Sequence, residues 1–172
     1  SIANAAIIEE LKKNIPDINV RILCDLYPDY KINIQAEQSA LLEADLIIWQ
    51  NPYYWYHFPA LMKKWLDDVF EHNFAYGSQA KLNGKKLLIS FTTGAPNEAY
   101  SGHPGSMGDM EKMDSCFPPI ASLCHLDYQG AMFLYGLIFA NSQDAEGIEK
   151  QRAAARDHAH KILSRIQEMQ KS

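Results

Sequence analysis

Residues 50–70, QNPYYWYHFPALMKKWLDDVF, follow directly on an apolar run, ADLIIW (44–49). The run lacks polar alternation, which is typical of a parallel strand covered on both faces. Aromatic residues and one histidine then occupy the stretch just past the strand, where loops more often carry polar turn residues. An aromatic-rich strand end suits the floor of a pocket for a flat ligand better than it suits a plain turn.

The same stretch continues into a predicted helix. Pro59 can open this helix, because the first helical turn needs no N–H from proline. Apolar residues then recur at helical spacing and predict one buried face, formed by Leu61, Met62, Trp65, Leu66 and Val69. We assign Tyr56, Phe58 and Trp65 to packing, while His57 is either a surface residue or part of the site.

Upstream of this stretch, helices and strands alternate. A helix over residues 2–13 ends near Asn14 and Pro16, and NVRILCDL (19–26) is expected to be a strand. A short helix over residues 36–44 then leads into the strand at 44–50.

Downstream of it, KKLLISF (85–91) predicts a strand, followed by a glycine-rich loop through Gly108. A helical pattern over 109–124 leads to the strand AMFLYGLIF (131–139). A closing helix is predicted by the spacing of Ile148, Ala155, Ile162, Ile166 and Met169. This alternation predicts a parallel sheet with helices on both faces, a three-layer α/β/α domain.

Composition narrows the class of protein. With 172 residues, of which 47% are hydrophobic, the chain suits one domain over residues 1–172. A net charge of −5 argues against a nucleic-acid partner, which needs a basic face. The longest apolar stretch, 130–140, is too short to span a bilayer and no signal peptide opens the chain, so we expect a cytoplasmic protein.

Cysteine and histidine give no metal site. The three cysteines lack a CxxC spacing. His158 and His160 lie two residues apart and would point to different faces of a helix, so we expect both on the surface.

Three motifs carry a family resemblance: PYYWYHFPALMKKWLDDVF (52–70), FAYG (74–77) and ISFTTGAPNEAYSGHPG (89–105). In this order and spacing they resemble the flavodoxin-like NAD(P)H:quinone reductases, a family that includes DT-diaphorase and the potassium-efflux ancillary proteins. The likeness covers almost the whole chain and implies a flavodoxin-like doubly wound parallel sheet. Because relatives begin with a strand ahead of the segment matching residues 1–4, it also implies a first strand upstream of this sequence.

The resemblance assigns Ser1, Ile2, Ala3 and Asn4 to the flavin phosphate and ribityl chain. Free N–H groups at a helix start suit an anion there. The alternative is an ordinary N-cap, for which serine is a favoured residue.

The ring of the flavin is bordered, in the resembling family, by the loop that matches Pro52, Tyr53, Tyr54 and Trp55. A core cluster for the following helix is the alternative. A second turn approaches the ring's pyrimidine edge and matches Thr92, Thr93, Gly94 and Ala95. Ala95 replaces a second glycine of the family pattern and fits only if the turn tolerates a side chain there.

Tyr100 and His103 are the residues that the resemblance assigns to chemistry, as hydrogen-bond donors and proton carriers beside the flavin. Tyr76 in FAYG matches a segment that reaches the partner's flavin across a dimer interface. A tyrosine packed on its own subunit is the alternative for Tyr76.

The implied activity is flavin-dependent hydride transfer from NAD(P)H to a quinone, with both substrates using one pocket in turn. FMN is favoured over FAD because no segment for an adenosine half is evident. The resemblance also implies a homodimer. Two alternatives stay open: a regulatory subunit of a membrane potassium-efflux antiporter, and a flavodoxin-like electron carrier.

Overall fold

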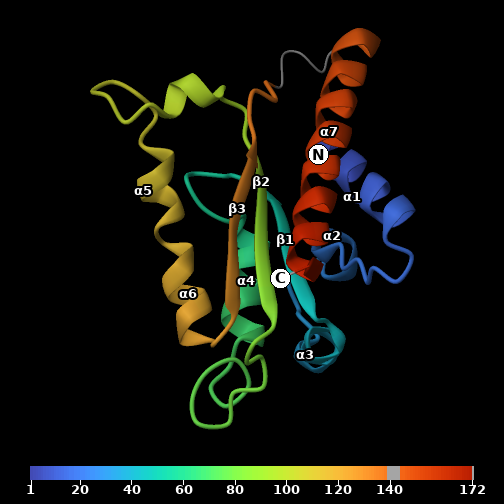
Figure 1. Cartoon of the computed structure of the whole chain (residues 1–172), viewed down its shortest axis with the longest axis vertical. Helices are drawn as coiled ribbons and strands as arrows, with labels where there is room; N and C mark the ends of the chain where they lie inside the picture. Colours follow the sequence, from blue (N-terminus) through green and yellow to red (C-terminus); the bar gives the residue numbers. More distant parts are fainter. Residues whose placement is uncertain (139–143, 172) are drawn as a thin grey trace.

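The computed structural model of the chain describes residues 1–138 and 144–171, with the side chains of residues 111 and 113 left aside. Its sheet is parallel, in the order β1-β2-β3, and consists of β1 (Leu46–Pro52), β2 (Lys86–Thr92) and β3 (Asp127–Leu134). Helices lie on both faces of the sheet, giving three layers (Figure 1). Because the strands are parallel, their carboxyl ends meet at one edge, the upper edge in Figure 1.

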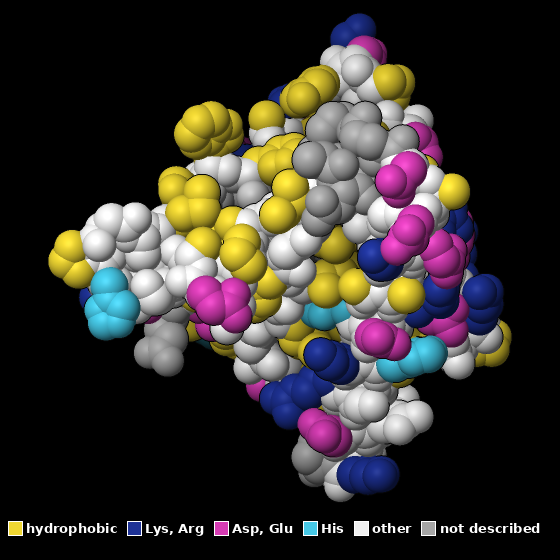
Figure 2. Space-filling view, turned by 90° about the horizontal axis from the view of Figure 1, so that it is seen from above, with side chains coloured by type: hydrophobic (Ala, Val, Ile, Leu, Met, Phe, Trp, Pro, Cys, Tyr) yellow, Lys and Arg dark blue, Asp and Glu magenta, His cyan; other side chains and the backbone are white. Residues whose placement is uncertain are grey.

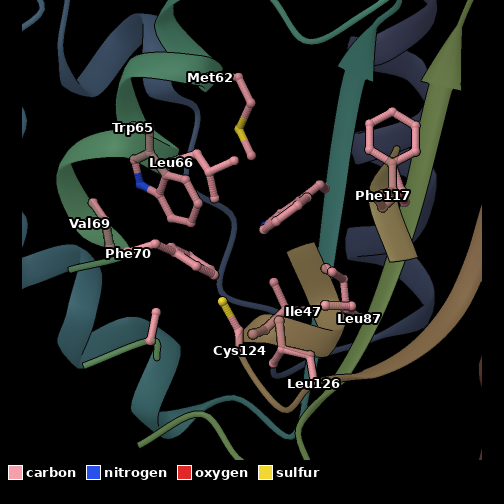
Figure 3. Close-up of a cluster of buried hydrophobic side chains, with 14 of the residues drawn as sticks. Ile47, Met62, Trp65, Leu66, Val69, Phe70, Leu87, Phe117, Cys124 and Leu126 are labelled. Carbon is pink, nitrogen blue, oxygen red and sulfur yellow. The ribbon is translucent and has the colours of Figure 1, made fainter. Parts of the chain in front are cut away.

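One face of the sheet packs on α4 (Ala60–Val69) and α6 (Phe117–Leu123). The largest buried cluster lies here and is rich in rings, with Trp49 making edge-on contacts to Phe58, Trp65 and Phe70. Figure 3 shows how side chains from α4, α6 and the strands meet in this cluster. The expected packing roles of Phe58 and Trp65 are confirmed, as is the buried face of α4.

The other face packs on α1 (Ile2–Asn14) and α7 (Ala145–Lys171), which lie against each other. Leu88 and Ile48 contribute the sheet's side of this second cluster. Since β2 is buried on both faces, its apolar run shows no alternation. The sequence predicted such burial for the run at 44–49, but in β1 half-buried and buried residues alternate.

The prediction of a strand at residues 19–26 is wrong. Ile22 has an extended backbone, but no described residue pairs with this segment, and residues 23–26 form one helical turn, α2 (Leu23–Leu26). Leu23 packs against the ring-rich cluster instead. A strand needs a neighbour for its backbone hydrogen bonds, so β propensity alone does not make one.

The helix expected over 109–124 is split into α5 (Met110–Asp114) and α6. Pro118 and Pro119 stand at the start of α6, where proline is tolerated, and proline cannot continue a helix from upstream.

The short helix expected at 36–44 is observed as α3 (Ile34–Glu43), capped by Asn33. No helix in the described part of the chain has both the length and the apolar character needed to cross a membrane.

Strand β3 begins earlier than expected and ends earlier. It starts at Asp127 and contains Gly130 at φ +94°, where its register against β2 shifts. This glycine forms a bulge that interrupts the apolar pattern, so the first half of the strand resembles a loop in the sequence. The expected strand end at Phe139 lies outside the described residues.

Glu37 on α3 is buried with three donors around it. Its carboxylate accepts hydrogen bonds from Arg21 (Nε, 2.8 Å), Tyr27 (Oη, 2.5 Å) and Trp65 (Nε1, 2.9 Å). Burial raises the pKa of Glu37, but these donors outweigh burial and hold its pKa below the ordinary value. The carboxylate therefore joins α3 and α4 to the segment around α2.

His158 is buried, so the expectation of a surface histidine is wrong for this residue. Its Nε2 lies 2.9 Å from Oγ of Ser90 on β2, and both side chains are buried between α7 and the sheet. Burial lowers the pKa of His158 to about 4, with a smaller contribution from the Lys161 cation. His160 is exposed as expected, with Nε2 3.3 Å from Oε1 of Glu10.

The depressed pKa of His158 predicts acid sensitivity. The stability that depends on neutral His158 is fully present above the unfolded-state pKa near 6.5 and is lost as pH falls toward the folded-state pKa of about 4. We expect this histidine to account for about 2 kcal/mol of lost stability by pH 5. Urea unfolding of His158→Gln at pH 7.5 and pH 5 should show a smaller pH effect than wild type. His160→Gln is the matched control and should keep the wild-type pH dependence.

Candidate functional site

The loops that follow the strands begin side by side at the carboxyl edge of the sheet. Pro52 pairs with Thr92 at the ends of β1 and β2. Just beyond them, Tyr53 N donates to Thr92 O at 2.8 Å, and Thr93 N donates to Leu134 O at 2.8 Å. The stretches 52–55 and 92–95, predicted as one site, therefore start in contact.

The start of α1 joins the same edge through Asn4. Its Nδ2 donates to Thr92 Oγ1 at 2.8 Å, and its Oδ1 accepts from Gln50 Nε2 at 2.7 Å. Ser1 caps the helix, since its Oγ accepts from Asn4 N at 3.3 Å. Ala3 is buried against α7 and offers only its main chain to a ligand. The structure thus brings the predicted phosphate-binding residues to the same edge as the two loops.

An exposed turn carries the aromatic residues that follow β1. Tyr54 and His57 exchange two backbone hydrogen bonds (3.1 and 3.0 Å), and Trp55 (φ 48°) and Tyr56 (φ 65°) form the turn between them. Positive φ at both central residues is the type I′ geometry, which normally takes Asn and Gly. Trp55 is 93% exposed and Tyr56 46%, so the assignment of Tyr56 to packing is wrong.

This turn stores backbone strain, which predicts a stabilising substitution. A residue with a side chain costs about 1–2 kcal/mol in the left-handed region. We expect Asn–Gly in place of Trp55–Tyr56 to raise the free energy of unfolding by about 1–2 kcal/mol in ligand-free protein, measured by urea denaturation. Tyr30→Gly is the matched comparison, since Tyr30 (φ 62°) is also in the left-handed region and half-exposed, but lies outside the candidate site. It should raise the free energy of unfolding for the same reason. A destabilised Asn–Gly protein would contradict strain at this turn.

Tyr53 departs from its exposed neighbours. It is buried, with its ring edge-on to Phe91 (4.9 Å between ring centroids) and Phe133 (5.7 Å). Its hydroxyl and Nδ2 of Asn51 are buried without a hydrogen-bond partner in the described part of the chain. Burial raises the pKa of Tyr53 well above the ordinary value. Of the three rings predicted as one aromatic wall, Tyr54 and Trp55 are exposed and Tyr53 lies inside the core.

His57 packs beneath the turn. Its ring lies against Phe58 (4.9 Å between centroids) and Phe117 (5.7 Å). Burial, and to a smaller extent the Lys63 cation, lowers the pKa of His57. His57, predicted as either a surface residue or part of the site, is half-buried and packs on these two rings instead.

The turn after β2 leaves free space above its backbone. Neither Gly94 nor Ala95 has a positive φ, so the turn tolerates the alanine that departs from the family pattern. Ala95 O accepts from Gly136 N (2.9 Å) and Thr93 Oγ1 (2.8 Å), which fixes the turn. A Cβ added to Gly94 would meet no atom nearer than Leu137 O at 3.9 Å. The protein itself therefore does not require glycine at residue 94.

Tyr100 and His103 are not joined. Tyr100 ends the short helix η1 (Asn97–Tyr100) and its ring lies 6.0 Å from that of Tyr135. Burial raises the pKa of Tyr100, and a hydrogen bond with Thr93 offsets part of the rise. His103 is exposed in the following turn, and no hydrogen bond links it to Tyr100 within the described residues.

Tyr76 lies apart from all of these residues. It belongs to the loop between α4 and β2, at the opposite end of the sheet (Figure 1). Its ring contacts His72 (5.5 Å between centroids) and its carbonyl accepts from Asn73 N at 2.7 Å. Within one chain, Tyr76 therefore cannot reach the candidate site.

Hydrophobic side chains gather at the carboxyl end of the sheet. Figure 2 looks onto this end and shows them around its middle, with most charged side chains to the right of the view. The exposed large hydrophobic residues include Tyr54, Trp55, Tyr56 and Met107. Sequence reasoning missed the polar residues Gln50 and Asn51, although they visibly end the apolar run of β1.

Comparison with known proteins gives a family match over most of the chain. Residues 1–159 match the family described as having a flavodoxin-like fold. Similar solved structures include one described as a thermophilic tryptophan halogenase from Streptomycin violaceusniger, with 30% identity and a TM-score of 0.77. That match covers 92% of this chain and 90% of the other.

Two further structures are similar in fold. General stress protein 14 of Treponema denticola, solved in complex with FMN, has 25% identity and a TM-score of 0.82, covering 96% of this chain and 91% of that one. An NADPH-quinone reductase from P. pentosaceus has 24% identity and a TM-score of 0.69, covering 91% and 88%. The second of these likenesses shows the fold alone.

Proposed function

We propose, because this chain belongs to the family with the flavodoxin-like fold, that it is a flavin-dependent oxidoreductase transferring two electrons from NAD(P)H to a quinone. The predicted fold class is confirmed by that family match. The substrate pair rests on the motifs at 52–70, 74–77 and 89–105 and on the chemistry of the site. The FMN complex of the Treponema denticola protein supports FMN ahead of FAD.

The observation that carries the proposal is the strained, exposed Trp55 turn at the strand end that adjoins Thr92–Ala95. An indole at 93% exposure on a backbone in the left-handed region contributes little to this chain's own packing. Strain of this kind persists at binding sites, where a ligand supplies the missing contact. A flat apolar ring stacked on the indole would supply it.

The remaining residues fit a flavin mononucleotide. The first turn of α1 offers N–H groups that lack partners within the helix, which suits a phosphate. The open space above Gly94 lets main-chain groups of residues 93–95 approach a ring edge without a Cβ in the way. When bound, the flavin would supply storage for two electrons between the two substrates. The chain's own part is to hold the ring, exclude water and donate hydrogen bonds.

Binding and kinetics test the proposal directly. Titration of the purified protein with FMN should perturb the flavin absorbance and saturate at one equivalent, and mass spectrometry of the copurified cofactor should identify FMN. NADPH or NADH oxidation with a benzoquinone as acceptor should give parallel initial-rate lines, because both substrates use one pocket in turn. A protein that takes up no flavin would overturn the cofactor assignment. Intersecting initial-rate lines with a good acceptor would overturn the use of one pocket by both substrates.

We assign to Tyr100 the hydrogen bond that stabilises negative charge at the flavin's edge. Tyr100→Phe keeps the ring and removes the hydroxyl, so we expect kcat to fall by about tenfold or more with FMN affinity unchanged. Stopped-flow reduction by NADPH measures the step concerned. His103→Gln is the companion variant. An equal fall in kcat would give the exposed histidine the same role, and an unchanged kcat would assign that role to Tyr100 and not to His103.

We also propose a homodimer in which Tyr76 serves the partner's site. Support comes from its place at the far end of the sheet from its own site, in a segment matching FAYG of the resembling family. Light scattering on the eluted protein should give twice the chain mass. Tyr76→Ala should raise the KM for the acceptor while the mass stays that of a dimer.

A further inference from the structure

A cavity of about 520 Å³ lies between η1, α5 and the end of β3. Tyr100, Phe133 and Tyr135 supply its aromatic walls, and Asp109 and Asp114 line its α5 side. None of the residues at 1–4, 52–55 or 92–95 lines it. The cavity is therefore built from a different part of the chain than the proposed flavin site, with Tyr100 shared.

The aromatic walls form a continuous series. The rings of Phe133 and Tyr135 stack with centroids 5.8 Å apart, and Tyr135 lies 6.0 Å from Tyr100. Tyr53 packs edge-on against Phe133 from inside the core. Such walls suit a flat ring, and their faces also attract a cation.

The charges in the cavity are negative. Asp114 accepts a hydrogen bond from Tyr128 Oη at 2.8 Å, and no ion pair between described residues involves it. Asp109 differs, since Lys112 Nζ lies 3.2 Å from its Oδ2. No lysine or arginine is among the described residues that line the cavity. Among the described residues, Asp114 is thus the cavity carboxylate that has no ion pair with a cation.

Tyr53 packs behind the cavity wall, against Phe133, and carries an orphaned hydroxyl. Tyr53 is only 8% exposed, and its hydroxyl has no hydrogen-bond partner in the described part of the chain. Tyr53 itself is not among the described residues that line the cavity, so its hydroxyl belongs to the core behind the wall.

We propose that this cavity binds a small aromatic ammonium compound, separately from the flavin. The ring lies between Tyr100, Phe133 and Tyr135, and the ammonium group donates to Asp114. Negative charge in the cavity disfavours phosphate and carboxylate ligands, so the site excludes the nicotinamide cofactor. Because the ligand contacts Tyr100, its binding alters the environment of a residue that serves the flavin site.

Isothermal titration with two isosteric probes tests this proposal without any variant. Tryptamine carries an ammonium group at neutral pH, and tryptophol carries a hydroxyl in its place. We expect tryptamine to bind at one equivalent to FMN-saturated protein, about tenfold more tightly than tryptophol, because a charge-assisted hydrogen bond is the stronger one. Equal affinities, or binding that FMN abolishes, would overturn the proposal.

Variants then locate the site. Asp114→Asn should weaken tryptamine binding by about tenfold and leave tryptophol unchanged, and Asp109→Asn should have a smaller effect because Lys112 already matches its charge. Asp17→Asn, an exposed carboxylate remote from the cavity, is the control for a general loss of negative charge. An Asp114→Asn protein that is folded by circular dichroism and binds tryptamine as wild type does would exclude the site. The same titration on flavin-free protein gives a result even if the chain binds no flavin.

Discussion

Gly94→Val should reduce FMN affinity by at least about 100-fold while the protein stays as stable as wild type. The structure separates these two effects. A Cβ at residue 94 would meet no protein atom nearer than 3.9 Å, and φ is not in the left-handed region, so valine fits the empty chain. A bound ring edge would approach this backbone, and the valine side chain would occupy its space.

Fluorescence titration with FMN and thermal unfolding of the ligand-free protein measure the two quantities independently. Gly94→Ala should give an intermediate loss of affinity, since it adds one methyl group to the same space. Ser78→Val is a control in an exposed turn at the other end of the molecule. If Gly94→Val bound FMN as wild type does, the flavin would have to lie elsewhere and the proposed site would be wrong.

Glu37→Ala is expected to have the largest effect on stability, with a loss of about 3–5 kcal/mol in the free energy of unfolding. The carboxylate is 1% exposed and accepts hydrogen bonds from Arg21, Tyr27 and Trp65. Its removal leaves a guanidinium, a hydroxyl and an indole N–H without their acceptor in a buried place. Urea denaturation at neutral pH measures the loss.

The control for Glu37 is Glu43→Ala, an exposed glutamate at the end of the same helix, which should change stability by less than about 0.5 kcal/mol. Removing both charges of the pair, as Glu37→Leu with Arg21→Met, should recover part of the loss, because the half-buried cation is then gone too. Since the pKa of Glu37 is lowered in the folded protein, its contribution is present above the ordinary carboxyl pKa and is lost as pH falls below it. If Glu37→Ala left the free energy of unfolding almost unchanged, water would be replacing the carboxylate as the hydrogen-bond acceptor.

Local patterns in the sequence predict the central strands and α4, because burial on both faces of a strand, or on one face of a helix, leaves its mark within a few residues. The run at 85–91 and the spacing from Leu61 to Val69 are of this kind. The strand expected at 19–26 fails because a strand also depends on a neighbour far away in sequence. The hydrogen bond between His158 and Ser90 spans 68 positions. The burial of His158 had a local signal that was overlooked, since its spacing from Ala155 and Ile162 places it on the apolar stripe of α7.

The candidate site was predictable in its parts and not in its geometry. The aromatic cluster and the threonine-glycine turn are visible in the sequence, and parallel strands bring such loops to one edge. The left-handed conformation of Trp55 and Tyr56 is not visible, since neither residue favours it. The split at Pro118 and Pro119, in contrast, had a signal in the sequence that the helical spacing of 109–124 concealed.

The uneven distribution of the three tryptophans gives the molecule two optical reporters. Trp49 and Trp65 lie in the ring-rich core, whereas Trp55 stands in water at the candidate site. Emission from an indole shifts to longer wavelength in a polar surrounding, so the red side of the spectrum belongs mainly to Trp55 and the blue side to the core pair. Quenching confined to the red side therefore reports occupation of the site, and a red shift of the blue side reports unfolding, in one unlabelled sample.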